Sequence, residues 1–388
     1  MVDFTNIKQA FSDKSNKDLN RAFVLFKTIS NPKISSILTS LVKLALLFRL
    51  PISYFIKNTI YKHFCGGETI DDSKKTINKL WKSSIGTILD YSAEGKKSED
   101  DFNKVLKETL QVIKESENNK RIPFIVFKAT GLIQFSVLEK LNTNEKLNNI
   151  DQNKFNGFLD KISIICNAAK ESNTPVLIDA EESWIQDAID NIVLNLMRAY
   201  NKEHVMIYNT LQFYRVDRIK YLNKLLEISR EENFKLGLKL VRGAYHQQEI
   251  ERAKQRKYPI PVHLKKEMTD RDFNLSLEIC IDNINRVSIC SGTHNEESSA
   301  FLLELMKEKE IENNDKRICS SQLLGMSDNI SYNLSAENYN VSKYVPYGPI
   351  REVIPYLIRR AEENKSISGQ MSRELKSIVK EKNRRKNN

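Results

Sequence analysis

The sequence contains few cysteines, and their spacing forms no known motif. Their number is odd and they lie far apart. This usage predicts reduced thiols in a cytosol-like compartment rather than a disulfide framework, and no metal site is expected. We expect Cys65, in FCGGET, to be a packed turn residue rather than a nucleophile. The cysteines are Cys65, Cys166, Cys280, Cys290 and Cys319.

Motifs for nucleic-acid binding are also missing. The chain has no C-x-x-C finger pattern and no repeats of aromatic and basic residues of the kind that binds single strands. Its formal net charge is +11, with lysine scattered along the whole length and concentrated only in KSIVKEKNRRKNN at the end. Basic residues distributed in this way predict a charged, solvated surface, so specific nucleic-acid binding is not expected.

No apolar run is long and unbroken enough to span a membrane. The most apolar stretch, residues 34–61, is interrupted by Lys43, Arg49, Pro51 and Lys57, and a span requires about 20 apolar residues. Two interpretations stay open for this stretch. It is an amphipathic helix packed on the main domain, or it faces a membrane surface or a quinone, because cations among Leu, Phe and Ile suit an anionic lipid interface.

No targeting sequence is evident at the N-terminus. The first 20 residues carry Asp3, Asp13 and Asp18 and have no apolar core, so they resemble neither a signal peptide nor a transit peptide. We therefore expect a bacterial cytoplasmic protein, with a peripheral position on the inner face of the cell membrane as a further option.

From Pro123 onward, short runs rich in Val and Ile alternate with amphipathic segments. The runs are PFIVFKAT, TPVLIDA, HVMIYNTLQ, KLGLKLV, RVSICSGTH, RICSSQLLG and NVSKYVPYG. This alternation predicts a parallel sheet with helical crossovers, either open or closed. A region of about 245 residues, without G-x-G-x-x-G or G-x-x-x-x-G-K-[ST], favours an α/β fold of the (β/α)8 barrel type. The expected division is a helical arm or cap in 1–118, the barrel in 119–370 and a basic tail in 371–388.

Polar residues end several of the predicted strands. Lys128, Asp179, Gln212 and the pair Thr293 and His294 lie at or just after the C-terminal ends of their strands. In a barrel these ends converge on one mouth, where active sites are built. The pattern therefore predicts a polar active site at the mouth.

A cluster of charged and aromatic residues lies in YVPYGPIREVIPYLIRRAEEN, residues 344–364. If residues 350–364 are helical, Tyr356, Arg359 and Arg360 share the face opposite the apolar residues. Periodicity alone allows an ordinary amphipathic helix with a solvated face. It also allows a clamp in which two guanidinium groups bind one carboxylate or phosphate beside a tyrosine ring.

These residues resemble the motifs of the proline dehydrogenase family, whose members are FAD-dependent enzymes that open proline catabolism. The resemblance rests on VFKATGL, VLIDAEESW, YNTLQFYR, KLVRGAY, GTHNEES, QLLGM and KYVPYGPIREVIPYLIRRAEEN, which occur in the family's order over about residues 120 to 370. It implies a distorted TIM-type barrel with FAD at the C-terminal mouth and the final helix laid across the site. We expect a monofunctional enzyme, because no aldehyde dehydrogenase domain follows in this sequence.

For the substrate, L-proline, the resemblance implies a carboxylate clamp, an ion pair in the pocket and an aromatic wall. Arg359 and Arg360 match the clamp, and Lys128 and Asp179 match the ion pair. The expected wall residues are Leu240, Tyr245, Tyr344 and Tyr356. The candidate catalytic residues are Asp179, Lys239 and Lys128.

For FAD, the resemblance implies contacts along the strand ends and the final helix. Lys239 is a partial departure, because many bacterial members have arginine there, near flavin N5. The positive charge is retained, but the hydrogen-bond geometry differs. The expected contacts are Ala180, Gln212, Lys239, Val241, Arg242, Gly243, Ala244, Thr293, His294, Asn295, Glu363 and Ser366.

The reaction implied is hydride transfer from the proline carbon next to nitrogen to flavin N5, which yields 1-pyrroline-5-carboxylate. The electrons are expected to pass to a membrane quinone, and the product to a separate pyrroline-5-carboxylate dehydrogenase. One alternative is hydroxyproline oxidation on the same scaffold, although Tyr344 weighs against it, because relatives that prefer hydroxyproline tend to have a small residue there. The other alternative is a noncatalytic basic protein that binds acidic partners or nucleic acid.

Overall fold

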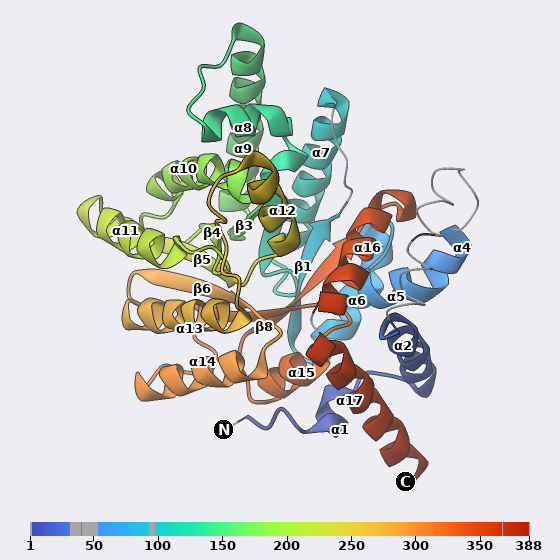
Figure 1. The fold of residues 1–388 in the computed structure, drawn as a ribbon. Coiled ribbons are helices and arrows are strands. Elements are labelled where there is room, and N and C mark those ends of the chain that lie inside the picture. Colours follow the sequence, from blue (N-terminus) through green and yellow to red (C-terminus); the bar gives the residue numbers. More distant parts are fainter. Residues whose placement is uncertain (1, 32–39, 41–52, 93–97, 367, 388) are drawn as a thin grey trace.

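The chain is described by a computed structural model that covers residues 2–31, 40, 53–92, 98–366 and 368–387, without the side chains of residues 53, 55 and 360–372. Eight parallel strands close into a barrel in which each strand pairs with the next and β8 pairs with β1 (Figure 1). The (β/α)8 barrel expected from the sequence is confirmed. The strands are β1 (Ile85–Tyr91), β2 (Phe124–Lys128), β3 (Val176–Asp179), β4 (Ile207–Gln212), β5 (Leu236–Val241), β6 (Val287–Gly292), β7 (Ile318–Leu323) and β8 (Val341–Tyr347).

Side chains along each strand alternate between the barrel interior and the surrounding helices. In β2, Phe124 and Val126 belong to an inner apolar cluster, whereas Ile125 and Phe127 belong to the large core between barrel and helices. The inner cluster also contains Tyr208, whose ring meets that of Phe124 edge to face with centroids 5.5 Å apart. These apolar side chains fill the N-terminal part of the interior and leave its C-terminal part to polar residues.

The first strand lies in the segment that the sequence assigned to a helical arm. β1 pairs with both β2 and β8, although it falls within residues 1–118. Its sequence, IGTILDY, is one short apolar stretch between two amphipathic helices. Periodicity alone cannot show whether a stretch of this length is a strand or part of a helix. The expectation of a wholly helical segment is therefore wrong at this strand, and the barrel begins before residue 119.

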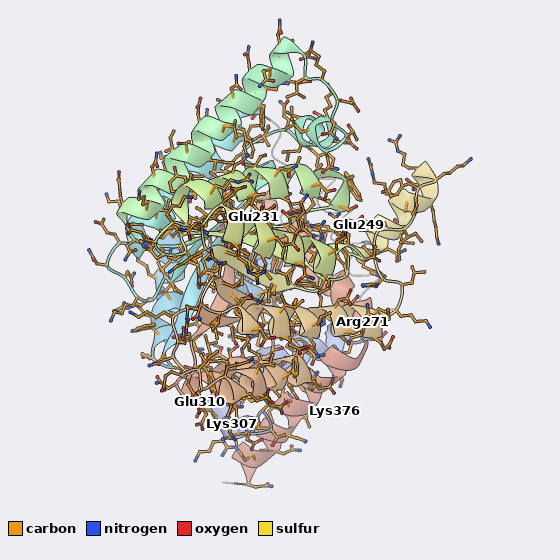
Figure 2. The ribbon with its side chains drawn as sticks, turned by 90° about the vertical axis from the view of Figure 1, so that its left-hand side faces the viewer. Glu231, Glu249, Arg271, Lys307, Glu310 and Lys376 are labelled. Carbon is orange, nitrogen blue, oxygen red and sulfur yellow. The ribbon has the colours of Figure 1, made fainter. Side chains whose placement is uncertain are left out.

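Helices cover the outside of the barrel (Figure 1). α7 begins at a capping box in which Ser98 and Asp101 exchange hydrogen bonds. Figure 2 shows charged side chains such as Arg271 and Lys307 on the outer surface of the helices on one side. The helices are α6 (Ile70–Trp81), α7 (Glu99–Ser116), η2 (Ala129–Gly131), α8 (Phe135–Asn142), α9 (Asn149–Glu171), α10 (Ser183–Tyr200), α11 (Arg218–Glu231), α12 (His246–Arg256), α13 (Lys266–Asp282), α14 (Glu296–Glu308), α15 (Asp328–Ala336) and α16 (Ile350–Ser366).

A second apolar core joins the N-terminal arm to the end of the chain. Phe26 of the arm, Val353 of α16 and Ile378 of α17 are all buried in it. Residues 371–388, which the sequence assigned to a basic tail, therefore belong mostly to the helix α17. This helix packs beside α2 (Figure 1). The remaining elements of this part are α1 (Ile7–Ala10), α2 (Asn16–Ile29), α4 (Ser53–Ile56), the π-helix η1 (Lys57–Tyr61), α5 (Lys62–Phe64) and α17 (Ser368–Lys386).

Most of the apolar stretch 34–61 lies outside the described residues. Within the described part, Ile56 and Tyr61 are buried in the second core, as the packing interpretation expects, whereas Tyr54 is exposed. Among the helices that the structure describes, none has the length and apolar character needed to cross a membrane.

A buried ion cluster connects the arm to the barrel. Lys343 of β8 has a fully buried side chain and lies 2.9 Å from Asp328, which also lies 3.1 Å from Lys14 of the arm. Burial by itself would raise the pKa of Asp328, but the two lysines outweigh it and hold that pKa well below its ordinary value. The carboxylate is therefore ionised and shared between two cations.

We expect Asp328→Asn to lower the free energy of unfolding by about 3–5 kcal/mol, because it leaves the Lys343 ammonium buried without its counter-charge. Urea unfolding followed by circular dichroism measures the change. Asp282→Asn is the matched control, since Asp282 lies 2.6 Å from Lys309 but both side chains are 49% exposed. Exposed pairs contribute little, so the control should leave the midpoint almost unchanged. Equal midpoint shifts in the two variants would contradict this account.

Candidate active site

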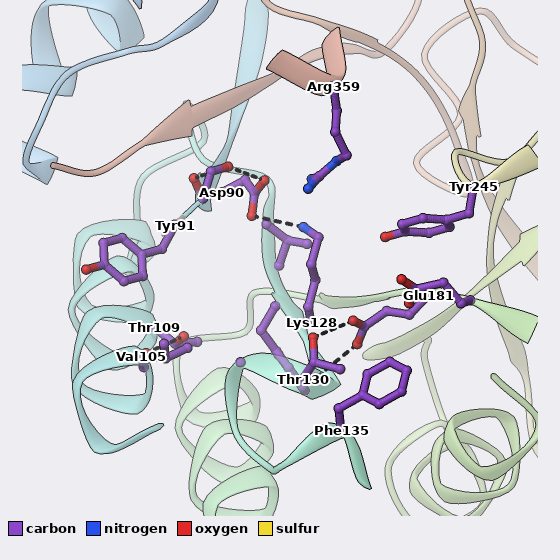
Figure 3. Close-up of a pocket in the computed structure, with 15 residues that line it drawn as sticks. Asp90, Tyr91, Val105, Thr109, Lys128, Thr130, Phe135, Glu181, Tyr245 and Arg359 are labelled. Atoms are coloured by element: carbon purple, nitrogen blue, oxygen red, sulfur yellow. Dashed lines mark hydrogen bonds and ion pairs between the residues drawn. The ribbon is translucent and has the colours of Figure 1, made fainter. Parts of the chain in front are cut away.

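A cavity of about 280 Å³ opens at the C-terminal ends of β1 and β2, the end of the barrel at which the sequence predicts the active site. Its wall also includes residues of α7, η2, α8, the loop after β3, the loop before α12 and helix α16. Figure 3 shows Lys128 reaching into the cavity from β2, with Asp90, Glu181, Tyr245 and Arg359 arranged around it.

Four charged residues of alternating sign form a chain across the mouth. Lys128 Nζ lies 3.5 Å from Asp90 Oδ1 and 3.4 Å from Asp179 Oδ2, and Lys239 Nζ lies 2.7 Å from Asp179 Oδ1. The register of the barrel places Lys128 directly beside Asp179, because the two residues pair at the ends of β2 and β3. The ion pair implied by the resemblance is therefore present, and Asp90 and Lys239 extend it on both sides.

The neighbouring charges keep the central pair ionised. Burial by itself would lower the pKa of Lys128, but Asp90 and Asp179 outweigh burial and raise it. Burial would likewise raise the pKa of Asp179, but Lys239, Lys128 and the hydrogen bond from Tyr344 lower it below its ordinary value. Both side chains are thus charged at neutral pH.

Tyr344 of β8 packs against the same carboxylate. Its hydroxyl donates to Asp179 Oδ2 at 2.6 Å, and the ammonium of Lys239 lies 4.2 Å from the centroid of its ring. Burial, together with the charge of Asp179, raises the pKa of Tyr344 well above its ordinary value. The phenol therefore remains a neutral hydrogen-bond donor with a fixed orientation.

Arg359 enters the cavity from helix α16. Figure 3 shows its side chain pointing toward Lys128, with the ring of Tyr245 on another side of the same space. Burial raises the pKa of Tyr245, which keeps its hydroxyl protonated. The cavity thus presents two cations, Arg359 and Lys128, together with the carboxylate of Asp90, a combination that suits a small zwitterion.

Two other residues that were expected to contact the substrate lie away from this cavity. Tyr356 is 7% exposed and belongs to the second core, and Leu240 is fully buried in the core between the barrel and its helices. Neither lines the described cavity. The side chain of Arg360, the second arginine of the predicted clamp, lies outside the described residues.

Glu181 connects two loops on the rim of the cavity. Its carboxylate accepts hydrogen bonds from the backbone N–H of Thr130, at 2.9 Å, and from the hydroxyl of Thr130. Its backbone is held by Gln186 and by Gln212, whose Nε2 donates to the carbonyl oxygen of Glu181 at 2.7 Å. Burial raises the pKa of Glu181, and the hydrogen bonds from Thr130 lower it by a smaller amount. The resulting pKa is about 7.

Several expected cofactor contacts lie in register at the ends of β4, β5 and β6. Gln212 pairs with Val241, and Val241 pairs with Gly292. Gln212 Oε1 also accepts the backbone N–H of Ala244 at 3.3 Å, which fixes the loop after β5. In that loop Gly243 has a φ of +130°, a conformation that favours glycine. Ala180 is buried between Asp179 and Glu181.

Arg242, Thr293 and Asn295 form a local network at the ends of β5 and β6. Arg242 donates to Thr293 Oγ1 at 2.6 Å and forms an ion pair with Asp270 at 2.6 Å. Asn295 caps α14 by accepting from the backbone of Ser298. His294 and Ser327 are joined by a hydrogen bond of 3.0 Å, and the side chains of Glu363 and Ser366 lie outside the described residues.

The sequence reasoning missed Asp90, Thr130 and Glu181. Asp90 ends an apolar run in the same way as Asp179 ends TPVLIDA, so the signal was present once the run was assigned as a strand. Glu181 and Thr130 follow strands β3 and β2, but nothing in the spacing shows that they bind each other.

Comparisons with known proteins identify the family of the chain. A family model described as proline dehydrogenase matches residues 73–373. The chain is similar to mitochondrial proline dehydrogenase 1 of Dictyostelium discoideum, with 33% identity over 97% of this chain and 74% of that protein. It is also similar to the carbapenem antibiotics biosynthesis protein CarD of Pectobacterium carotovorum, with 32% identity over 86% of this chain and 85% of that protein.

Solved structures share the fold. Proline utilization A (PutA) from Bdellovibrio bacteriovorus, inactivated by N-propargylglycine, matches with a TM-score of 0.72 and 18% identity over 96% of this chain and 40% of that chain. A PutA structure with proline bound in remote sites matches with a TM-score of 0.67 and 21% identity over 82% of this chain and 32% of that chain. The chain thus spans less than half the length of these structures, and the likeness shows the barrel architecture.

We expect Glu181 to contribute a fall in the stability of the protein as the pH rises from about 5 to about 8, because its carboxyl group ionises. The folded-state pKa of Glu181, about 7, lies above its ordinary value of 4.5, so its contribution is complete below pH 4.5 and is lost as the pH passes 7. Glu181→Gln should remove this part of the slope, and urea midpoints measured across the range test it. The same substitution at Glu231, exposed at the end of α11 (Figure 2), should leave the slope intact. Parallel pH profiles for wild type and Glu181→Gln would rule out this role for Glu181.

Proposed function

The chain belongs to the proline dehydrogenase family, and we propose that it oxidises L-proline to 1-pyrroline-5-carboxylate in the first step of proline catabolism. The observation that carries this proposal is the meeting of Arg359 and Lys128 in one cavity beside Asp90. Proline has one carboxylate and one amine, and a cavity with charges of both signs can bind both groups.

In this proposal Arg359 binds the carboxylate of proline, together with Arg360 of the same helix. A guanidinium group offers two parallel N–H donors, which match the two oxygens of a carboxylate. Lys128 is held by Asp90 and Asp179, so its charge stays in place whether the cavity is filled or empty. Tyr245, which lines the cavity, is assigned to the wall around the ring together with Tyr344, whose hydroxyl donates to Asp179.

We propose FAD as the cofactor, and the residues at the ends of β4, β5 and β6 fit a flavin. Lys239 lies two residues before Val241 in β5, on the same inward face. A Cβ at Gly292 would come within 2.9 Å of Val241 Cγ1, so glycine allows Val241 to pack closely against the end of β6. The row of strand ends at Gln212, Val241 and Gly292 lies beside the buried ammonium group of Lys239, and a cation at this place suits an electron-accepting ring.

The residues assigned to FAD extend from this row toward the loops and the final helix. These residues would hold FAD, which would supply the hydride acceptor for the proline carbon next to nitrogen. Asp179 holds the ammonium group of Lys239 at 2.7 Å, where its positive charge would stabilise the negative charge that a bound flavin gains. The assigned residues are Ala180, Gln212, Lys239, Val241, Arg242, Gly243, Ala244, Thr293, His294, Asn295, Glu363 and Ser366.

We also propose that a membrane quinone takes the electrons and that a separate pyrroline-5-carboxylate dehydrogenase takes the product. The apolar stretch 34–61 is the segment that would face lipid. Its described residues also support a role in packing, because Ile56 and Tyr61 are buried in the second core.

We expect Arg359→Ala to raise the KM for proline by about 10- to 100-fold with a smaller change in kcat, because a hydrogen bond to a charged group contributes about 1.5–3 kcal/mol. Steady-state rates with an artificial electron acceptor measure both constants. Arg351→Ala is the matched control, since Arg351 is exposed on the same helix. A proline KM that is the same in Arg359→Ala and Arg351→Ala would remove Arg359 from the clamp.

The proposed function is tested most directly by the visible absorption spectrum of the purified protein. We expect a flavin band that bleaches when L-proline is added without oxygen, and that bleaches much less with hydroxyproline. A band that stays oxidised with proline would overturn the substrate. A colourless protein that cannot be reconstituted with FAD would overturn the cofactor.

A further inference from the structure

The segment 57–67 contacts the rim of the barrel at two glycine turns. The hydroxyl of Tyr61 donates to the carbonyl oxygen of Gly348 at 2.8 Å, and His63 Nε2 lies 2.9 Å from the carbonyl oxygen of Gly325. Both glycines have positive φ, +139° and +78°, and they follow strands β8 and β7. The segment therefore binds the backbone at the ends of two neighbouring strands.

Gly348 is the point at which the chain turns from β8 into α16. Its backbone N–H donates to the carbonyl oxygen of Gly67 at 3.1 Å, so segment 57–67 binds both its N–H and its carbonyl oxygen. Two residues earlier, the carbonyl oxygen of Pro346 accepts the backbone N–H of Gly66 at 2.8 Å. The approach is tight, since a Cβ at Gly66 would lie 2.6 Å from Val345 Cγ1. This contact explains Gly66 of FCGGET, whereas a Cβ at Gly67 would lie 2.4 Å from Cβ of Asp72 in α6.

Tyr61 is also packed against the helix that it helps to place. It is 4% exposed and lies in the second core with Ile350, Val353 and Leu357 of α16. Burial raises the pKa of Tyr61 far above its ordinary value, so the hydroxyl stays a donor at all physiological pH values. The π-helix η1 ends at this residue.

We propose that Tyr61 is a positioning residue for proline binding. By fixing Gly348 it fixes the start of α16 and therefore the place from which Arg359 enters the cavity. The barrel alone does not determine this place, because α16 packs in the second core. The assignment rests on the proposed function, in which Arg359 binds the carboxylate of proline.

The test compares Tyr61→Phe with Tyr200→Phe. Each variant removes one hydroxyl group and its hydrogen bond, but Tyr200 donates to Asn167 at 2.7 Å on the outer helices, far from α16 in the fold. In Tyr61→Phe we expect the amides of residues 350–359 to exchange about 3- to 10-fold faster, because one buried hydrogen bond no longer opposes opening. The KM for proline should rise about 2- to 10-fold while kcat stays within about twofold. Mass spectrometry of exchanged peptides and steady-state kinetics measure these quantities.

Faster exchange confined to α16, together with a raised KM in Tyr61→Phe alone, supports the positioning role. Unchanged exchange of α16 overturns it, and so does faster exchange with an unchanged KM, which would show that the helix start does not control binding. Equal changes of exchange and KM in both variants would also overturn it, because they would show a general loss of stability. If the wild-type protein does not oxidise proline, the proposed function fails, whereas exchange alone still decides whether Tyr61 holds α16.

Discussion

The geometry of the site depends on one carboxylate, that of Asp179. Its Oδ1 atom binds Lys239, and its Oδ2 atom binds both Lys128 and the hydroxyl of Tyr344. A single residue at the end of β3 therefore orients side chains from β2, β5 and β8. The apolar layer below it, with Phe124 and Tyr208, excludes water from the N-terminal side, which strengthens each of these interactions. Because the anion is surrounded by two cations and a donor, it can remain ionised although it is buried.

Much of this arrangement could be predicted from the sequence. Each apolar run from PFIVFKAT onward became a strand, and Lys128 and Asp179 meet because parallel strands end at the same edge. β1 was missed because a single run of its length does not distinguish a strand from part of a helix. With that strand unassigned, Asp90 had no predicted position. Glu181 and Thr130 could not be paired either, since contacts between two loops depend on the path of the backbone and leave no spacing in the sequence.

The final helix shows a different limit of sequence reasoning. The pattern of residues 350–364 separates an apolar face from a face with Tyr356 and Arg359, and the structure buries Val353 and Leu357 as this pattern predicts. Tyr356 is also buried in the second core, so the helix is covered on more than one side. Amphipathic periodicity describes burial against one partner. It could not show that α16 lies between the arm and the mouth of the barrel, and it could not show that α17 follows it as a packed helix.

In the proposed function, a bound amino acid would contact two separately packed parts of the molecule. Lys128 and Asp90 belong to the barrel, whereas Arg359 belongs to a helix whose apolar side packs in the second core. The connections between these parts include Lys14 with Asp328, Tyr61 with Gly348 and Gly67 with Gly348. A change at one of these connections would alter the distance between the two ends of the binding site without altering either end. Substrate affinity can therefore depend on residues of the N-terminal arm that never touch the substrate, while the charges around Asp179 depend on the barrel alone.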